Sequence, residues 1–195
     1  MSLVDAVVKV GGSFLRDPAS HHAAVSAIAD AATRWRLLVV PGGGPFADLV
    51  RLFDRAMSLG DDGAHWLAIR AMDAHAELLA AKLPDARVVE LAEDIADALA
   101  ARQIPVLASS RLLRERDPLP HSWQVTSDSI AAWVAGELGA PKLVLLKPVS
   151  GEAVALSDEY FRLALPETVQ AIAIGVDELS SGRLRGELGA AAVTN

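Results

Sequence analysis

The hydrophobic pattern of this 195-residue chain alternates between two kinds of segment. In the first kind nearly every position is apolar, which is typical of a strand buried on both faces. These apolar runs span 3–10, 37–40, 88–91, 105–108, 143–146 and 169–174, and a last strand-like run, AAAV, spans 190–193. In the second kind apolar residues recur at helical spacing. Helices are therefore predicted over 18–34, 46–57, 64–82, 93–102, 127–139, 158–165 and 176–180.

Two segments interrupt this alternation. The Asp61-Asp62-Gly63 stretch is expected to break the helical pattern, and the mixed-charge segment 109–120 is expected to form a loop. Buried strands that alternate with helices favour a mostly parallel sheet covered by helices on both faces. The predicted fold is therefore α/β, a three-layer α/β/α sandwich, and residues 1–195 are expected to form a single domain.

Composition narrows the partners that such a domain can have. The formal net charge of −7 disfavours nucleic acid and anionic membrane surfaces as partners, and no apolar segment reaches the ~18 residues of a membrane span. The chain contains no cysteine, which excludes disulfides and thiolate metal sites and favours a reducing compartment. We therefore expect a cytoplasmic protein that binds neither nucleic acid nor membrane, and no residue spacing predicts a protein-bound metal ion.

The first candidate site is the turn after the first apolar run, because ligands of parallel sheets bind at the carboxyl ends of the strands. Lys9 lies at the end of that run and is followed by Gly11, Gly12 and Ser13. Glycine lets backbone N–H groups approach an anion closely, and the lysine supplies a positive charge beside them. This pattern indicates a phosphate site, although a glycine turn that only ends a strand next to a lysine would look the same.

A second glycine turn, Gly42-Gly43-Gly44, follows the second apolar run and leads into a predicted helix. Such a turn directs backbone N–H groups at an anion near a helix N-terminus. The glycines also fit the loose dinucleotide pattern G-x-G-x-x-A, but the strand with an acidic end that this site needs about 20 residues later is replaced by a predicted helix. The chain contains no G-x-x-x-x-G-K-[ST] motif, so a P-loop is excluded.

A third signal is the Thr126-Ser127-Asp128-Ser129 stretch at the start of a predicted helix. Serine and aspartate there are ordinary N-caps, which satisfy free backbone N–H groups. Alternatively, Asp128 lies near Lys9 and holds the lysine ammonium toward a phosphoryl group. The long helix over 64–82 carries His65 and His75, which face either an acceptor or the solvent.

Four segments together resemble the amino acid kinases. They are V-K-V-G-G-S at 8–13, V-V-P-G-G-G-P at 39–45, T-S-D-S-I-A-A at 126–132 and L-K-P-V-S-G at 146–151. The resemblance implies an ATP-dependent phosphotransferase that uses Mg²⁺ on the phosphates and works by positioning and charge neutralisation. It also implies an acceptor-binding part over about 1–125 and a shortened nucleotide-binding part over about 126–195.

The resemblance implies roles for individual residues. Lys9 would stabilise the transferring phosphoryl group and Asp128 would orient Lys9. The phosphates would contact Gly11, Gly12 and Ser13, the acceptor would contact Gly42, Gly43, Gly44, Trp123 and Ser127, and the nucleotide would contact Lys147, Val149 and Gly151. Many members carry a second catalytic lysine in the nucleotide half, where this chain has none beyond Lys147. Either Lys147 takes that role, or Arg183 or Arg185 does.

The S-W-x-V-T-S-D-S-I-A-A stretch before the L-K-P-V-x-G strand end is similar to one branch of this superfamily. That branch phosphorylates 5-(aminomethyl)furan-3-ylmethyl phosphate to its diphosphate, in the biosynthesis of methanofuran-type carriers of one-carbon metabolism. Trp123 is then placed to stack on a furan ring. The alternatives are a uridylate-type nucleoside monophosphate kinase and a non-catalytic nucleotide- or oxyanion-binding module of the same fold. A homo-oligomer is expected.

Overall fold

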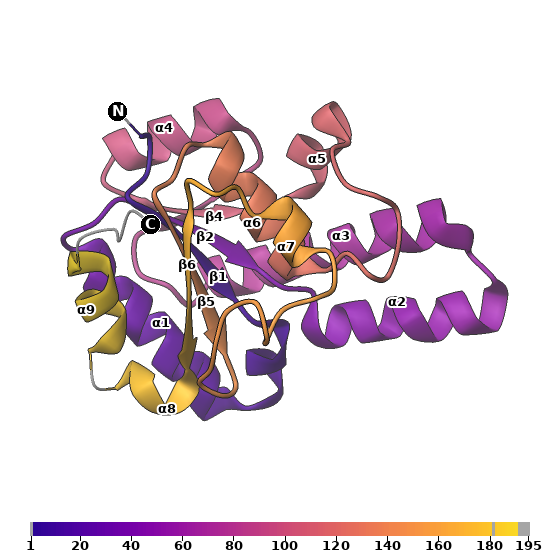
Figure 1. Cartoon of the computed structure of the whole chain (residues 1–195), viewed down its shortest axis with the longest axis horizontal. Helices are drawn as coiled ribbons and strands as arrows, with labels where there is room; N and C mark the ends of the chain where they lie inside the picture. The colour runs from indigo at the N-terminus through magenta and orange to yellow at the C-terminus, as the bar shows by residue number, and fades with distance from the viewer. Residues whose placement is uncertain (1, 181, 191–195) are drawn as a thin grey trace.

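Six parallel strands form one sheet in the order β3-β4-β2-β1-β5-β6 (Figure 1). This computed structural model describes residues 2–180 and 182–190. The strands are β1 (Ala6–Val10), β2 (Leu37–Pro41), β3 (Ala86–Val89), β4 (Ile104–Leu107), β5 (Lys142–Lys147) and β6 (Gln170–Gly175). Because helices cover both faces of this sheet, the predicted three-layer α/β/α fold is confirmed.

The helices follow the predicted order with several shifted ends. They are η1 (Gly12–Arg16), α1 (Pro18–Ala32), α2 (Gly44–Met57), α3 (Gly60–Ala80), α4 (Ala92–Ala100), α5 (Ser110–Arg116), α6 (Ser127–Glu137), α7 (Phe161–Ala164), α8 (Val176–Leu179) and α9 (Arg183–Gly189). None of the helices in the described part of the chain is long and apolar enough to cross a membrane.

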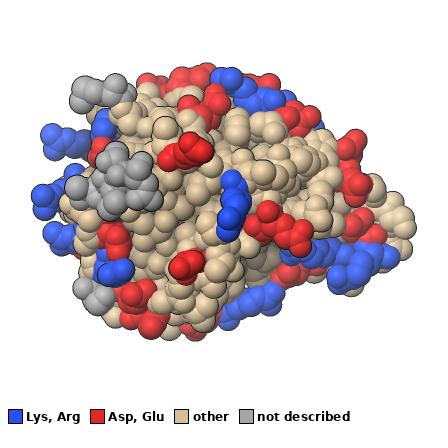
Figure 2. Space-filling view, viewed as in Figure 1, with Lys and Arg blue, Asp and Glu red and all other residues tan. Residues whose placement is uncertain are grey.

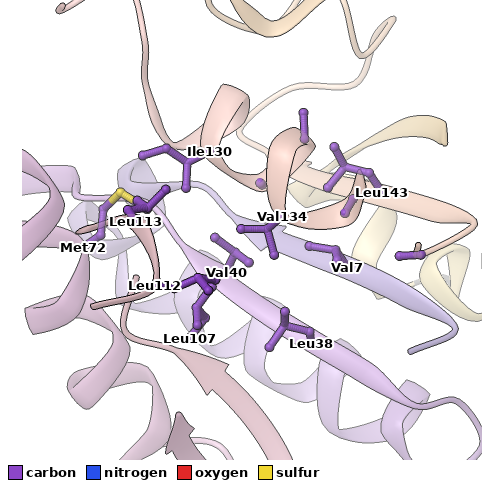
Figure 3. Close-up of a cluster of buried hydrophobic side chains, with 14 of the residues drawn as sticks. Val7, Leu38, Val40, Met72, Leu107, Leu112, Leu113, Ile130, Val134 and Leu143 are labelled. Atoms are coloured by element: carbon purple, nitrogen blue, oxygen red, sulfur yellow. The ribbon is translucent and has the colours of Figure 1, made fainter. Parts of the chain in front are cut away.

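The core lies in two layers, one on each face of the sheet. Helices α4 to α7 cover one face, and Figure 3 shows Val134 of α6 close to Val7 of β1, with Ile130 of the same helix beside Leu113 and Met72. Helices α1, α8 and α9 cover the other face. Every residue of β1, β2 and β5 is buried, as the unbroken apolar runs predict.

Three predicted boundaries are wrong. Asp61-Asp62-Gly63 lies in the first turn of α3, and the chain breaks instead at Ser58, which has a left-handed φ of 53°. The segment 109–120 contains α5. Ala190 follows the unpredicted helix α9 as its C-cap, and the rest of the run AAAV lies outside the described residues.

Helices α2 and α3 form an antiparallel hairpin that extends away from the sheet (Figure 1). The apolar side chains of α2 are half exposed or more at Leu49, Leu52, Phe53 and Met57. Acidic and basic side chains mix over the face drawn in Figure 2. The expected homo-oligomer stays a prediction.

Candidate active site

The two glycine turns touch each other through their backbones. A Cβ atom on Gly12 would lie 2.1 Å from the backbone N of Gly44, and a Cβ on Gly44 would lie 2.3 Å from the Gly12 carbonyl oxygen. Gly44 also has a left-handed φ of 52°. The turns meet because β1 and β2 are neighbours in register, with Val10 opposite Pro41. Glycine is therefore required here for the contact between the turns, in addition to any contact with an anion.

His75 supports the second glycine turn from α3. Its side chain is fully buried, and Nδ1 lies 2.5 Å from the Gly42 carbonyl oxygen. Burial lowers the pKa of His75 to about 4, against the opposing effect of this hydrogen bond. The ring is therefore neutral near pH 7, and its Nδ1–H donates to Gly42. The solvent-facing position considered for His75 is wrong.

Strand geometry places two lysines on one face of the sheet. Side chains alternate along a strand, so Lys9 projects to the same face as Val7, and Lys147 projects to the same face as Leu145. Val7 and Leu145 both pack in the layer that contains α6. Because β1 and β5 are adjacent, the two lysines lie side by side beneath the N-terminal end of α6.

Asp128 lies between these lysines. Its Oδ1 is 2.7 Å from Lys9 Nζ, and Lys147 Nζ donates to its Oδ2 at 2.5 Å. All three residues are buried, each less than a tenth exposed. The helix is capped by Thr126, whose hydroxyl oxygen accepts from the Asp128 N–H. Asp128 is thus free of the N-cap role, and its carboxylate serves the lysines.

The charges of this cluster perturb one another. Burial raises the pKa of Asp128, and the positive charges of Lys9 and Lys147 lower it. The lowering is the larger effect, so the pKa of Asp128 is below its ordinary value. Burial and the charge of Lys9 lower the pKa of Lys147, against the opposing effect of Asp128. Two ammonium groups and one carboxylate leave one net positive charge, which an entering phosphoryl group can neutralise.

The loop after β5 folds back over the cluster. Lys147 Nζ also donates to the Leu156 carbonyl at 2.6 Å. Asp158 accepts from the Thr126 N–H at 3.1 Å and hydroxyl at 2.6 Å, and from the Ser129 N–H at 3.2 Å and hydroxyl. Asp158 therefore fixes the first turn of the helix that carries Asp128. Sequence reasoning missed this residue, because nothing near it in the chain shows which helix it binds.

The arginines that could replace a second lysine lie elsewhere. Arg183 pairs with Glu187 at 2.7 Å, and Arg185 pairs with Asp30 at 3.2 Å. In the expected nucleotide turn, Val149 and Gly151 are exposed, and the hydroxyl of the intervening Ser150 donates to Glu178 at 2.6 Å. Of the three alternatives, only Lys147 reaches Asp128 within the described residues.

A cavity of about 300 Å³ opens beside the glycine turns. Its walls come from η1, α2, α3 and residues 122–130. Six of the expected phosphate and acceptor residues line it: Gly12, Ser13, Gly43, Gly44, Trp123 and Ser127. Gly11 and Gly42 do not line it, and each is tied to a strand instead: Gly11 N–H donates to the Leu146 carbonyl at 3.2 Å, and Gly42 N–H to the Val10 carbonyl at 2.8 Å.

Charged side chains that sequence reasoning missed also line the cavity. Asp48 forms an ion pair with Arg16 and lies 3.5 Å from Arg51. Arg51 lies over the ring of Trp123, 4.5 Å from its centroid, and Trp123 donates its Nε1–H to Asp54 at 2.9 Å. These contacts fix the position of the Trp123 ring in the cavity wall. Their only sequence signal is the i, i+3 spacing of Asp48 and Arg51.

A histidine cluster borders the cavity on the outer part of α3. The rings of His65 and His121 stack with centroids 4.1 Å apart. Hydrogen bonds to Asp62 and Asp117 raise the pKa of His121, whereas burial and the neighbouring His121 lower the pKa of His65 to about 4. His65 therefore presents an uncharged imidazole to the cavity near pH 7.

Positive charge that is fixed before a ligand enters stabilises a phosphoryl group. In this chain the charge lies at the carboxyl edge of a parallel sheet, and the sequence contains no P-loop motif. The amino acid kinases are such proteins, and the chain belongs to the amino acid kinase family. The sequence profile of that family matches residues 6–151.

One curated relative and two solved structures are similar to the chain. The [5-(aminomethyl)furan-3-yl]methyl phosphate kinase of Methanocaldococcus jannaschii is 29% identical over 145 residues, which are 74% of this chain and 66% of that relative. The chain thus spans about two thirds of the length of this relative. Uridylate kinase from Archaeoglobus fulgidus has a TM-score of 0.59 at 22% identity, covering 77% of this chain and 65% of that one. UMP kinase from Bacillus anthracis has a TM-score of 0.63 at 15% identity, and the match covers 94% of this chain and 93% of that one.

Proposed function

We propose that the protein transfers the γ-phosphoryl group of ATP to a phosphate monoester. The observation that carries this proposal is the buried Lys9–Asp128–Lys147 cluster at the carboxyl edge of the sheet. The cluster does not itself line the cavity, but Ser127, the residue before Asp128, does. Membership of the amino acid kinase family supports it. The proposed acceptor is [5-(aminomethyl)furan-3-yl]methyl phosphate, the compound in the name of the Methanocaldococcus relative. The product is then the corresponding diphosphate.

In the proposed reaction an oxygen of the acceptor phosphate attacks the γ-phosphorus of ATP, and the bond between this phosphorus and the bridging β–γ oxygen breaks. ADP leaves with that oxygen. Lys9 and Lys147 offset the negative charge on the transferring group, and Asp128 fixes the position of both ammonium groups. The barrier falls because the positive charges are in place before the reaction begins.

The remaining expected residues divide between the two substrates. In this proposal Gly12 and Ser13 contact the phosphates, Gly43 and Gly44 with Trp123 and Ser127 hold the acceptor, and Lys147, Val149 and Gly151 border the nucleotide. Gly11 and Gly42, expected as contacts from the sequence, support the two turns through their bonds to the strands. No group of three or more His, Asp or Glu side chains within 2–180 and 182–190 is arranged to hold a metal ion. Mg²⁺ is therefore proposed to enter bound to the ATP phosphates, where it would neutralise part of their charge.

One observation favours a second candidate, a non-catalytic binding module. Lys147 is already engaged by the Leu156 carbonyl, and Ser150 in the expected nucleotide turn binds an acidic side chain. A module of this kind would bind ATP and the phosphate monoester without forming ADP.

The proposal is tested by removing one buried charge. Lys9→Met keeps the length of the side chain and is expected to lower kcat by about 100-fold or more, the effect of losing one preorganised charge. ADP release with the aminated furan phosphate and phosphorus NMR of the diphosphate are the measurements. Lys82→Met is the control, because Lys82 is exposed outside the site. Near-normal turnover by Lys9→Met would contradict the proposal, and binding without ADP formation by the unmodified protein would favour the module.

A further inference from the structure

The cavity is long, and its two ends differ in chemistry. Asp61, His65, Ala68 and Met72 follow one another along the face of α3 that lines the cavity. A helix rises 1.5 Å per residue, so the Cα atoms of Asp61 and Met72 lie roughly 16 Å apart along this wall. His75, one turn beyond Met72, contacts Gly42. Met72 therefore marks the inner end at the glycine turns. Asp61, in the first turn of α3, marks the outer end, and Figure 1 shows this end of α3 at the tip of the hairpin.

The inner part of the cavity favours an anion. Gly12, Ser13 and Gly44 bring backbone to its surface, and two guanidinium groups, Arg16 and Arg51, share the single carboxylate of Asp48. The two guanidinium groups exceed this carboxylate by one positive charge on the α2 wall of the cavity, where Arg51 also lies over Trp123. A phosphate group is accordingly stabilised at this end.

The outer end favours a cation. Within residues 2–180 and 182–190 the Asp61 carboxylate makes no hydrogen bond or ion pair, whereas the adjacent Asp62 is engaged by His121 at 2.5 Å. Asp61 also lines a shallow groove at the cavity mouth together with Asp158 and Glu159. The mouth thus carries an excess of negative charge, and the Asp61 carboxylate lines the cavity without an ion-pair partner among the described residues.

We propose that Asp61 binds a protonated amine at the far end of the acceptor and so selects phosphate monoesters that carry one. The inference rests on the proposed function and narrows its substrate class. An ammonium group against Asp61 forms a charge-assisted hydrogen bond, which is stronger than a bond between neutral groups. A small ring with a phosphate arm and an aminomethyl arm places opposite charges at the two ends of the cavity. A nucleoside monophosphate presents an uncharged base to Asp61 and lacks the attraction between opposite charges that an ammonium group gains there.

Asp61 lies in the first turn of α3, so its charge also affects the stability of that helix. The test must separate this effect from binding of the ligand. A carboxylate there stabilises the helix whatever the ligand. Glu93→Gln is the matched control, because Glu93 is an exposed carboxylate in the first turn of α4, outside the cavity. Asp61→Asn keeps the size of the side chain and removes only the charge.

The experiment measures binding by isothermal titration calorimetry, with a non-hydrolysable ATP analogue present. The two probes are [5-(aminomethyl)furan-3-yl]methyl phosphate and its 5-methyl analogue, which lacks the amine. The unmodified protein is expected to bind the aminated probe about tenfold more tightly, the lower range for a hydrogen bond between charged groups because the mouth is open to water. Asp61→Asn is expected to abolish this preference and leave the affinity for the 5-methyl probe unchanged, and Glu93→Gln is expected to keep it.

Three results would overturn the inference. They are equal binding of the two probes by the unmodified protein, a preference that survives in Asp61→Asn, and an equal loss of affinity for both probes in that variant. Turnover is measured separately. If the preference depends on Asp61 but no diphosphate forms, the inference stands and the proposed phosphoryl transfer fails.

Discussion

Asp128 forms an ion pair with two buried ammonium groups at once, so its charge matters to the fold as well as to the chemistry. Asp128→Asn removes the carboxylate charge and leaves Lys9 and Lys147 buried side by side. Removing one partner of a buried ion pair typically costs about 3–5 kcal/mol. We expect a loss of stability of this order and a fall in kcat of about 100-fold, because the lysines are no longer held in place.

The pH dependence of unfolding checks this role. The folded pKa of Asp128 is below its ordinary value, so its ionised form contributes stability above the unfolded pKa of about 3.9. That contribution falls as the pH drops through the folded pKa. Urea unfolding should therefore show a large gap between the unmodified protein and Asp128→Asn at pH 7, and a smaller gap in acid. Asp97 is exposed, so Asp97→Asn should have the same free energy of unfolding as the unmodified protein at both pH values. An Asp128→Asn protein of unchanged stability would show that the Asp128 charge does not stabilise the buried lysines.

At the scale of elements, the interlocked glycine turns fix how η1 and α2 begin. Gly12→Ala places a Cβ within 2.1 Å of backbone and must push the two turns apart. We expect a lower melting temperature and a fall in kcat/KM of at least about tenfold, because the cavity wall and the phosphate-binding turn move together. Activity assays and thermal unfolding measure both effects.

Gly186→Ala is the control for this change. Gly186 lies in α9, and a Cβ there meets nothing within 4 Å. Alanine has the higher helix propensity, so this variant should be as stable as the unmodified protein or more stable by about 0.5–1 kcal/mol. Equal behaviour of the two alanine variants would show that the turns have room to relax.

The accuracy of the sequence predictions differs between elements for physical reasons. The central strands were predicted well, since a strand buried on both faces is apolar at nearly every position, and the buried lysines lie near the strand ends. The start of α3 was predicted wrongly. Asp-Asp-Gly is typical of a turn, but carboxylates also stabilise the first turn of a helix, and the sequence alone does not distinguish the two. Helix α5 has only seven residues, which is too short for a clear period.

The candidate site shows the same limit. The turns around Lys9, Gly42 to Gly44 and Asp128 stand out in the sequence because unusual residues follow apolar runs. Arg16, Asp48 and Asp158 do not stand out, since each acts through a contact whose partner the local sequence does not reveal. The position of Lys147 beside Lys9 depends on β5 pairing with β1, and a sequence pattern alone does not give the strand order.

At the scale of the whole molecule, the expected acceptor and nucleotide parts share one sheet. Strand β1 pairs with β2 on one side and with β5 on the other, so the boundary near residue 125 cuts through continuous hydrogen bonding. We propose that the chain unfolds as a single unit. Urea unfolding followed by far-UV circular dichroism and by tryptophan fluorescence should give coincident transitions. Trp66 and Trp133 report on the two parts, and two separate midpoints would show independent units.

The contact between Gly12 and Gly44 also limits how such a protein can diverge. A side chain at either position collides with backbone atoms of the other turn, and no second substitution can remove a backbone atom. Neutral drift is therefore blocked at both positions for as long as the turns touch. A change of acceptor is then expected to arise in the side chains that line the cavity on α2, α3 and residues 122–130, where a single substitution changes charge or shape without moving the phosphate-binding backbone. Acceptor specificity can therefore change at the cavity wall while the glycine turns and the charged cluster at the sheet edge keep their positions.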